Sequence, residues 1–593
     1  MTLRPSCLLP ALARRSTAPG RPSRPGHHNR SGNRWIPHSR RTPRHRGRSP
    51  ARLSTLALAL VVTAAGTLGA APAGPAAPSA AHAASATTEW RFFDLPGHDG
   101  VRLRASLIAP STPGPHPALV FISSWGLNDA EYLAQARRFA AAGYVVLSYT
   151  PRGFWGSGGQ IETAGPPDVA DVSAVLDWLI ENTSADPRRI GLGGVSYGAG
   201  ISLLAASQDA RIRAVAAMST WTDLVASLYG DQTRRPQAVA LLHLTAELFG
   251  RPSAEFERTV ADYFANRNVP EVQAWGRLRS PASYLAGLNA NAPAVLIANA
   301  YGDSLFPPNQ LVDLFTEFTG PKRLELAPGD HAIPELTGLI GLPNHVWSSV
   351  RAWFDRYVAA ADGDVTDDAT VEASGGVASD AGPVVLRVRN NADVVESYRD
   401  WADVTGSTVR YHLGAVPWHG TGPLTTEPAA GWHTSFRAVG DTVAGGGVPL
   451  LTNGLEPLTG VPAVAWLPAV DRHRGAVWSS AAQPGGAALR GIPRLRLTVT
   501  PSASSGTVVA YLYDLDPLGL GRLITHAPVT WTGASPGRPL ELSVALPATA
   551  WDVPAGHRIA LVVDTKDPLY LDANPYGATI SVHGGSWLDL PLR

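Results

Sequence analysis

A serine flanked by glycines stands where an apolar run gives way to a helical pattern. Gly194-Val195-Ser196-Tyr197-Gly198 matches G-x-S-x-G. The apolar run 189–193 precedes it and the helix-forming run 199–206 follows it, which is the strand–turn–helix order of a nucleophile elbow. Glycines two positions to either side leave room for so tight a turn. We therefore predict that Ser196 is a nucleophile.

Such a serine needs a general base and an acid that orients the base. Asp303 and His331 follow Ser196 in that order, each directly after a predicted strand, where α/β sheets place functional groups. We predict that His331 is the base and Asp303 its partner. Asp330 is the rival acid, but it adjoins His331 and is badly placed to reach that ring, so a turn or surface role suits it better.

The charge that develops on a substrate carbonyl needs hydrogen-bond donors. The backbone N–H of Tyr197 is the first donor that its position predicts. The second is expected from the loop 123–127, which follows the apolar run 118–122. Trp125 is the candidate there, through its main chain or its indole N–H.

The segment from Trp90 to about Val358 alternates short apolar runs with helical stretches, as βαβ units do. This pattern predicts an α/β-hydrolase fold. The expected strands are 118–122, 144–148, 190–195, 212–218, 294–298 and 323–326, and the expected helices include 130–142 and 168–182. Residues 224–289 break the rhythm with helix-rich sequence, which predicts an inserted cap over the substrate pocket.

A polar, acidic stretch at 359–383 reads as a linker. Strand signals multiply beyond it, which predicts a β-sandwich of jelly-roll type. These strands are expected at 384–389, 494–500, 507–513, 540–546 and 559–563. The expected organisation is therefore a targeting segment (1–83), a catalytic domain (84–358), a linker (359–383) and a sandwich (384–593).

The first 83 residues have the pattern of a secretory signal. Thirteen arginines and no acidic residue fill positions 1–52, an apolar stretch covers 53–71, and Ala81-His82-Ala83 is an A-x-A cleavage site, with 84–86 as an alternative. Arg40-Arg41 would allow a twin-arginine reading. We expect a secreted protein, without an integral membrane domain once the signal is removed.

Charge and cysteine content exclude several partners and chemistries. Without those thirteen arginines the chain has 36 basic residues against 48 acidic ones, which argues against nucleic acid as a partner. The lone cysteine, Cys7, lies in the targeting segment, so we expect no disulfide and no cysteine nucleophile in the mature protein. We find no metal or nucleotide motif and expect no cofactor. The oligomeric state stays open.

Several segments resemble the CocE/NonD-type serine hydrolases of peptidase family S15, which include bacterial cocaine esterase and X-Pro dipeptidyl-peptidases. The similar segments are 151–159, 168–178, 189–200, 494–500, 511–517 and 555–561. The resemblance covers roughly residues 90–593. It implies an ester or amide hydrolase with a jelly-roll domain, acting on a small acyl ester or on a peptide after an X-Pro pair.

The sequence departs from this family at two places. Thr150 stands where the family usually has an aspartate two residues before Arg152. The family's oxyanion tyrosine has no counterpart, because the matching loop offers Trp125, which lacks a hydroxyl. We also find no acidic residues that would hold a substrate's free amine.

A second class of function uses the same domains without catalysis. The sandwich could bind carbohydrate or cell wall through a platform of aromatic side chains, drawn from Trp401, Trp418, Trp432, Trp478 and Trp551. Large aromatics more often fill cores and interfaces. An ordered set of serine, aspartate and histidine also argues for an enzyme.

Overall fold

The computed structural model describes residues 88–360 and 382–593. The targeting segment and nearly all of the expected linker lie outside these residues. Within them, no helix is long and apolar enough to cross a membrane.

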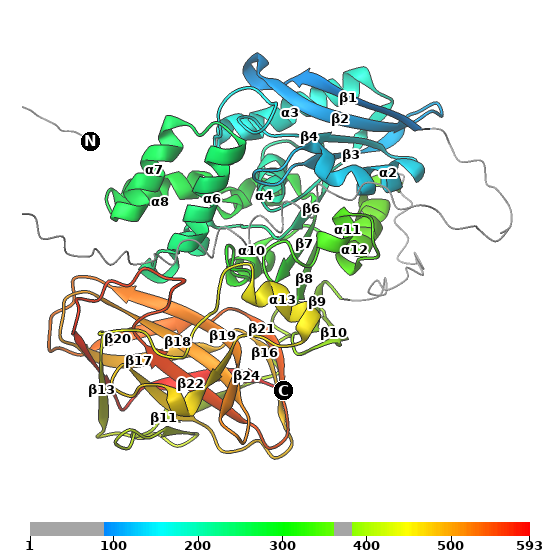
Figure 1. The fold of residues 1–593 in the computed structure, drawn as a ribbon. Helices are drawn as coiled ribbons and strands as arrows, with labels where there is room; N and C mark the ends of the chain where they lie inside the picture. Colours follow the sequence, from blue (N-terminus) through cyan, green and yellow to red (C-terminus); the bar gives the residue numbers. More distant parts are fainter. Residues whose placement is uncertain (1–87, 361–381) are drawn as a thin grey trace, which may run out of the picture. The chain divides into compact units, whose positions relative to one another are not determined.

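The N-terminal part is built on a sheet with strand order β1-β2-β4-β3-β5-β6-β7-β8-β9-β10 (Figure 1). Strands β3 to β9 pair in parallel, while β1, β2 and β10 pair antiparallel at the two edges. The bounds are β1 Thr88–Pro96, β2 Arg102–Pro110, β3 His116–Ile122, β4 Val145–Tyr149, β5 Ala185–Val195, β6 Ile212–Met218, β7 Ala294–Ala300, β8 Lys322–Ala327, β9 Val384–Val388 and β10 Asn391–Tyr398. This is the predicted α/β-hydrolase fold, and every strand expected between 118 and 326 is present.

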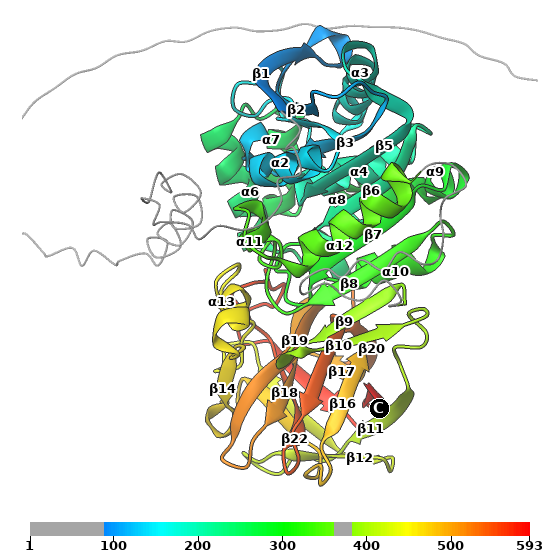
Figure 2. The ribbon, with the colours of Figure 1, turned by 90° about the vertical axis from the view of Figure 1, so that its right-hand side faces the viewer.

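Helices cover both faces of this sheet, because parallel strands are apolar on both sides (Figure 2). On one face lie α2 (Leu133–Ala141) and α12 (His345–Phe354), whose aromatics pack around Phe121. The other face carries α3 (Pro166–Asn182), α4 (Tyr197–Ala206), α9 (Leu285–Asn291) and α10 (Asn309–Glu317). The core on this second face also contains the residues that surround the elbow.

A group of helices stands between β6 and β7, where the sequence predicts a cap (Figure 1). It comprises α5 (Leu224–Tyr229), α6 (Pro236–Phe249), α7 (Ala254–Ala265) and α8 (Val269–Leu278), and it leads into α9. The side chains Phe256, Val260 and Tyr263 of α7 are buried and join the core that reaches the elbow. The inserted helices therefore pack on the catalytic half of the sheet.

One expected sandwich strand belongs to the catalytic sheet instead. The run that begins at Val384 forms β9, which pairs in parallel with β8, and β10 then closes the edge. A strand in a parallel sheet is buried on both faces and reads as a continuous apolar run, as Val384-Val385-Leu386 does. A run this short does not reveal which of two sheets it joins, so the expectation that the strand at 384–389 belongs to the sandwich is wrong.

The remaining strands form two sandwich-like sheets joined through β12, which pairs antiparallel with β11 and parallel with β15. One sheet contains β11 Ser407–Leu413, β13 His433–Arg437, β16 Ala487–Gly491, β17 Arg494–Pro501, β20 Leu540–Ala545, β21 Thr549–Val553, β23 Thr579–His583 and β24 Trp587–Leu592. The other contains β14 Val464–Trp466, β15 Gly475–Ser479, β18 Gly506–Leu515, β19 Leu520–Trp531 and β22 Arg558–Asp564, and the joining strand β12 is Gly422–Thr425. A helix that the strand-rich pattern did not predict, α13 (Thr452–Thr459), interrupts them.

Candidate active site

Ser196 occupies a strained turn between the end of β5 and the start of α4. Its φ of 56° and ψ of −114° lie outside the regions that non-glycine residues ordinarily adopt. A Cβ on Gly198 would lie 1.8 Å from the Ile122 carbonyl oxygen, and one on Gly194 would lie 2.7 Å from the Gly198 carbonyl carbon. Both glycines of the motif are therefore required by space, as the sequence analysis expects.

The structure brings Ser196, His331 and Asp303 into one hydrogen-bonded chain. The His331 Nε2 lies 2.8 Å from Ser196 Oγ, and its Nδ1 lies 2.9 Å from Asp303 Oδ2. Asp303 Oδ1 accepts from the backbone N–H groups of Leu305 and Phe306, which hold the carboxylate in place. The Asp303 side chain is fully buried and that of His331 is 10% exposed. In this arrangement one imidazole nitrogen faces the acid and the other faces the hydroxyl.

The electrostatics of His331 follow from its neighbours. Burial disfavours the charged imidazole and lowers its pKa, whereas the charge of Asp303 and the hydrogen bond to it raise the pKa. The net shift is upward from the ordinary value of 6.5. The imidazole is thereby a stronger base than a free histidine.

The two predicted oxyanion donors belong to the first residue of α4 and to the loop after β3. Tyr197 is the first residue of α4, so its backbone N–H lies outside the helical hydrogen-bond ladder. The Trp125 indole N–H donates to the Leu242 carbonyl at 3.0 Å and to Thr245 Oγ1 at 3.1 Å, both on α6. The indole is therefore engaged with the cap. Of the two groups considered at Trp125, only the main-chain N–H is left for a substrate.

A buried carboxyl holds the loop that carries Trp125. Glu131 accepts from the backbone N–H of Ser124 at 2.8 Å and from its hydroxyl at 2.6 Å. The same hydroxyl contacts the Val195 carbonyl, next to the nucleophile. Burial raises the pKa of Glu131 to about 7. The sequence does not predict these hydrogen bonds between the loop and the elbow. Glu131 lies in a predicted helix, and no motif around it indicates a contact with Ser124.

Asp330, the rival acid, does not touch the imidazole. Its Oδ1 accepts from the backbone N–H groups of Ser304 and His331, and its Oδ2 accepts from that of Leu450. The residue is fully buried, so a turn role is right and a surface role is wrong. Burial, together with the charge of Asp303, raises its pKa to about 6. Asp330 thus fastens both loops of the site to the segment before α13.

Glu335 is a second carboxyl near the base that the sequence did not reveal. It accepts a hydrogen bond from the Ser219 hydroxyl, whose oxygen in turn accepts from the Ala332 N–H, one residue after His331. Burial raises the pKa of Glu335 to about 7. The pair supports the backbone that carries the imidazole.

The segment similar to the family's R-G motif is structural. Arg152 forms a bidentate, buried pair with Asp171, at 2.8 and 2.7 Å. Thr150, at the place of the usual aspartate, accepts a hydrogen bond from the Asp129 N–H and donates one to the Asp129 carboxylate. The hydroxyl group therefore keeps a contact there without adding a second carboxylate.

A cavity opens on Ser196 beneath the cap. It encloses about 860 Å³ of empty space, its solvent-facing mouth included. Its walls come from the loop of Trp125, from the elbow, from Trp221 and Phe306, and from α5 to α8. The cavity therefore gives a small organic group a route to Ser196.

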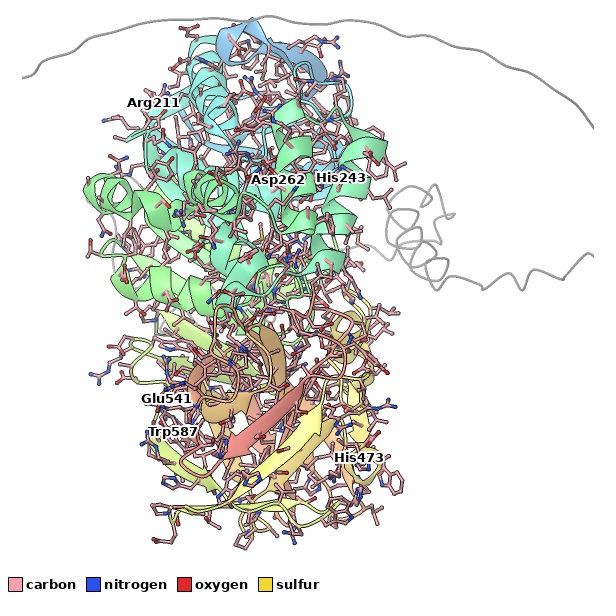
Figure 3. All side chains as sticks on the ribbon, turned by 90° about the vertical axis from the view of Figure 1, so that its left-hand side faces the viewer. Arg211, His243, Asp262, His473, Glu541 and Trp587 are labelled. Carbon is pink, nitrogen blue, oxygen red and sulfur yellow. The ribbon has the colours of Figure 1, made fainter. Side chains whose placement is uncertain are left out.

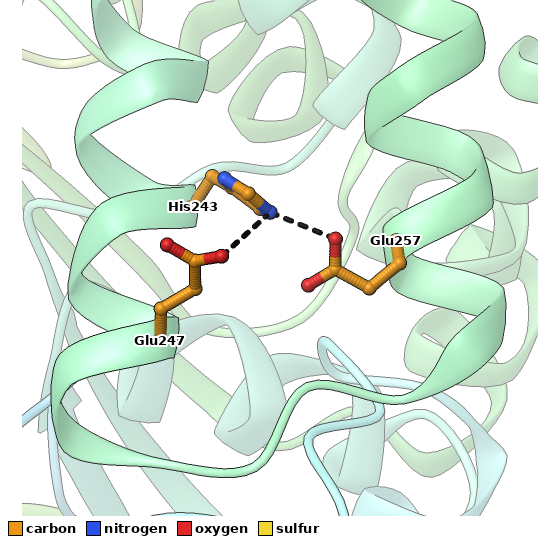
Figure 4. Close-up of side chains that lie close together, drawn as sticks. All are labelled: His243, Glu247 and Glu257. Atoms are coloured by element: carbon orange, nitrogen blue, oxygen red, sulfur yellow. Dashed lines mark hydrogen bonds and ion pairs between the residues drawn. The ribbon is translucent and has the colours of Figure 1, made fainter.

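One cluster in the described part of the chain could hold a metal ion. His243 and Glu247 on α6 and Glu257 on α7 place their ligand atoms within 4.8 Å of one another (Figure 4). The His243 Nε2 already lies 2.9 Å from a Glu257 oxygen, which is an ordinary ion pair or hydrogen bond. His243 and Asp262 mark this region of the cap in Figure 3. The cluster contributes no residue to the lining of the cavity at Ser196.

The aromatics considered for a carbohydrate platform are mostly internal. Trp478 and Trp551 are completely buried, and Trp401 and Trp432 pack partly against the cores. Trp418 is 86% exposed, and its ring neighbours are His419 and His473. The five tryptophans therefore do not form one exposed surface.

The family follows from two profile matches that lie on the two parts of this fold. The X-Pro dipeptidyl-peptidase (S15 family) profile matches residues 99–333, and that of the X-Pro dipeptidyl-peptidase C-terminal non-catalytic domain matches 376–588. The chain belongs to the S15 family. The cocaine esterase of Rhodococcus is 31% identical over 111 residues, or 17% of this chain and 18% of that protein.

Solved structures of other hydrolases resemble the fold over most of this chain. An α-amino acid ester hydrolase superposes with a TM-score of 0.63 at 16% identity, covering 88% of this chain and 100% of the other. A CocE/NonD family hydrolase from Staphylococcus aureus gives 0.61 at 12% identity, covering 85% and 94%. At such identities the likeness establishes the fold. Among curated relatives, the first matches span only 48% and 44% of the relatives' own lengths.

Proposed function

We propose that this protein hydrolyses an ester or amide through an acyl-enzyme on Ser196. The observation that carries the proposal is the chain of hydrogen bonds from Ser196 through His331 to Asp303, with the serine on a strained elbow. A hydroxyl so placed loses its proton to the imidazole as it attacks. Membership of the S15 family supports the same class of reaction.

In the acylation half of the reaction, Ser196 is the nucleophile and His331 carries its proton to the leaving group. Ser196 Oγ attacks the substrate carbonyl carbon while His331 Nε2 takes the hydroxyl proton. The oxyanion accepts hydrogen bonds from the backbone N–H groups of Tyr197 and Trp125. Asp303 holds the Nδ1–H tautomer and stabilises the imidazolium. Nε2 then gives its proton to the leaving alcohol or amine, and the acyl–Ser196 ester remains.

Deacylation repeats the steps with water. His331 takes a proton from the water that attacks the acyl carbon, and the carboxylic acid leaves as Ser196 recovers its proton. This chemistry serves both small acyl esters and peptides cleaved after an X-Pro pair. Turnover of aryl esters against Gly-Pro and Ala-Pro anilides separates the two, since a dipeptidase must turn over the anilides.

Export completes the proposed function. The arginine-rich start, the apolar stretch 53–71 and the A-x-A site at Ala81-His82-Ala83 support it. Expression of the full chain in a secreting host tests it. The N-terminal residue of the secreted protein should be Ala84 or Thr87, whereas a protein retained in the cell with an intact N-terminus would contradict export.

Labelling with a fluorophosphonate tests the nucleophile. The wild-type protein should be labelled and Ser196→Ala should not, with Ser202→Ala as a matched control because Ser202 lies in α4 but donates to the Gly198 carbonyl. Absence of labelling in folded wild-type protein would contradict the proposal.

A further inference from the structure

The cavity at Ser196 contains no charged side chain in its walls. None of its lining residues is an aspartate, glutamate, lysine, arginine or histidine. The cap contributes Val239 and Leu242 from α6, Phe256 and Val260 from α7, and Val272 from α8. Burial of an unpaired ion among such groups costs several kcal/mol.

Three hydroxyl groups of the wall are already engaged, whereas the Thr163 hydroxyl and the Trp275 indole N–H are buried without a hydrogen-bond partner. Tyr197 Oη donates to Asp168, Tyr263 Oη donates to the Leu228 carbonyl, and Thr259 Oγ1 donates to the Glu255 carbonyl. A hydroxyl turned toward its own partner presents mainly carbon to the cavity. The walls therefore offer a bound group mainly apolar contact, with two uncharged polar groups and no ion.

Ionisable groups lie behind the wall and not in it, with the Asp168 carboxyl behind Tyr197 and the Arg279 guanidinium behind Trp275. Arg279 is buried, and its guanidinium stacks 3.9 Å from the centre of the Trp275 ring, which lines the cavity. Its carboxylate partner, Glu255, is half exposed and is not among the residues that line the cavity. A substrate ammonium in the cavity would therefore find no carboxylate in the wall to pair with.

The position of the base shows which part of a substrate this cavity receives. The leaving group must lie against His331 Nε2, which donates its proton, and His331 is absent from the cavity wall. Ser196, Tyr197 and Trp125 do line the cavity, and they bind the carbonyl carbon and oxygen of the acyl group. The cavity therefore extends from the acyl side of the carbonyl.

We propose that this cavity is an acyl pocket for neutral, apolar acyl groups, and that it rejects substrates with an α-ammonium group. The inference rests on the proposed acyl-enzyme and makes the substrate class narrower. The proposal excludes amino acid esters and peptides with a free N-terminus as good substrates of this protein. The ligand class is an ester of an aliphatic or aromatic carboxylic acid.

A matched pair of substrates tests the proposal. The p-nitrophenyl esters of hexanoic acid and of norleucine share a carbon skeleton and differ by the α-ammonium group, which is kept protonated at pH 6. We expect kcat/KM to be about 10³-fold lower for norleucine. Along the series from acetate to hexanoate, kcat/KM should rise about fourfold for each methylene. Equal or better use of the norleucine ester, or no rise with length, would overturn the inference.

An isosteric variant supplies the reverse experiment. Gln273 lies in the wall on α8, so Gln273→Glu adds a carboxylate with little change of shape, and Gln273→Leu is the neutral control. The first variant should raise the norleucine-to-hexanoate ratio of kcat/KM about fivefold and the second should not. An unchanged ratio in a folded Gln273→Glu protein would count against the acyl pocket.

Acetate separates failure of this inference from failure of the proposed function. Its acyl group is too small to need the pocket. If the wild type turns over p-nitrophenyl acetate and Ser196→Ala does not, the nucleophile stands whatever the hexanoate and norleucine rates are. If the wild type turns over no ester and no anilide, the proposed function fails and the pocket assignment fails with it.

Discussion

At the scale of single residues, the site depends on one acid that touches the imidazole and another that does not. Asp303 contacts His331 Nδ1, whereas Asp330 binds three backbone N–H groups. Both carboxyls are buried. Asp303 is hydrogen-bonded to the base, and Asp330 precedes it in the sequence. Their roles are therefore separable by substitution.

Replacement of each acid by its amide should give different results. Asp303→Asn removes the hydrogen-bonded anion, and kcat/KM should fall about 10⁴-fold. Asp330→Asn should keep activity within about tenfold, because no contact to the ring is lost. Steady-state kinetics on an aryl ester, with thermal unfolding as a check of folding, measures both. A larger loss at Asp330 would reverse the assignment of the acid.

The pH dependence of activity follows from the base. Only neutral His331 accepts the serine proton, so kcat/KM should rise with pH through the His331 pKa, which is shifted above 6.5. Asp303 raises that pKa, so its loss in Asp303→Asn should move the rising limb to lower pH while the plateau falls. A limb that stays in place or moves to higher pH would show that Asp303 does not act on this imidazole.

The order of the three residues was predictable because each follows a recognisable strand or lies in a motif with a steric requirement. The supporting carboxyls were not. Glu131 and Glu335 act through hydrogen bonds to Ser124 and Ser219, and these contacts exist only after distant segments have packed.

At the scale of elements, Trp125 joins the oxyanion loop to the cap. Its indole N–H binds α6, and its ring meets that of Tyr197 at 5.1 Å. The sequence indicates the loop of Trp125 as the source of a donor but does not choose between the indole and the main-chain N–H. That choice depends on where α6 docks.

Trp125→Phe tests this role. Loss of the indole hydrogen bonds should lower the free energy of unfolding by about 1 kcal/mol and change kcat less than about tenfold. Trp155→Phe is a matched control, since the Trp155 indole N–H donates to Gly126 in the same loop. A loss of 10²–10³ in kcat at Trp125 alone would show that its indole is an oxyanion donor.

The sheets themselves were only partly assignable. β6 was predicted to the residue, because Ile212–Met218 is bounded by turns and fully apolar on its inner faces. β9 was placed in the wrong sheet, since its apolar run suits either. β9 pairs with β8 because the edge of β8 is available for another strand, and the local sequence of β9 does not indicate this.

At the scale of the whole molecule, contacts from the strand-rich part reach the catalytic loops. Asn453 on α13 donates to the Gly302 carbonyl, next to Asp303, and the Leu450 N–H donates to Asp330. Arg389, directly after β9, forms a buried bidentate pair with Glu456 of α13. The second domain is therefore part of what positions the site.

Loss of the buried pair should affect stability and activity together. Glu456→Ala leaves the Arg389 guanidinium buried without its carboxylate, which should cost about 3–5 kcal/mol in the free energy of unfolding. Because α13 also holds the Asp303 loop, kcat should fall several-fold below the unfolding temperature. Arg399→Ala, at a side chain that is 91% exposed, is the control and should change stability by less than about 0.5 kcal/mol. Equal effects of the two substitutions would contradict a positioning role for α13.

Trapping of the intermediate tests the central claim most directly. Wild-type protein mixed with p-nitrophenyl hexanoate and quenched in acid within the first turnover should carry one hexanoyl group, and peptide mass spectrometry should place it on Ser196. Ser196→Ala should carry none. Ester turnover without any acylated protein, or acylation at another residue, would contradict the account.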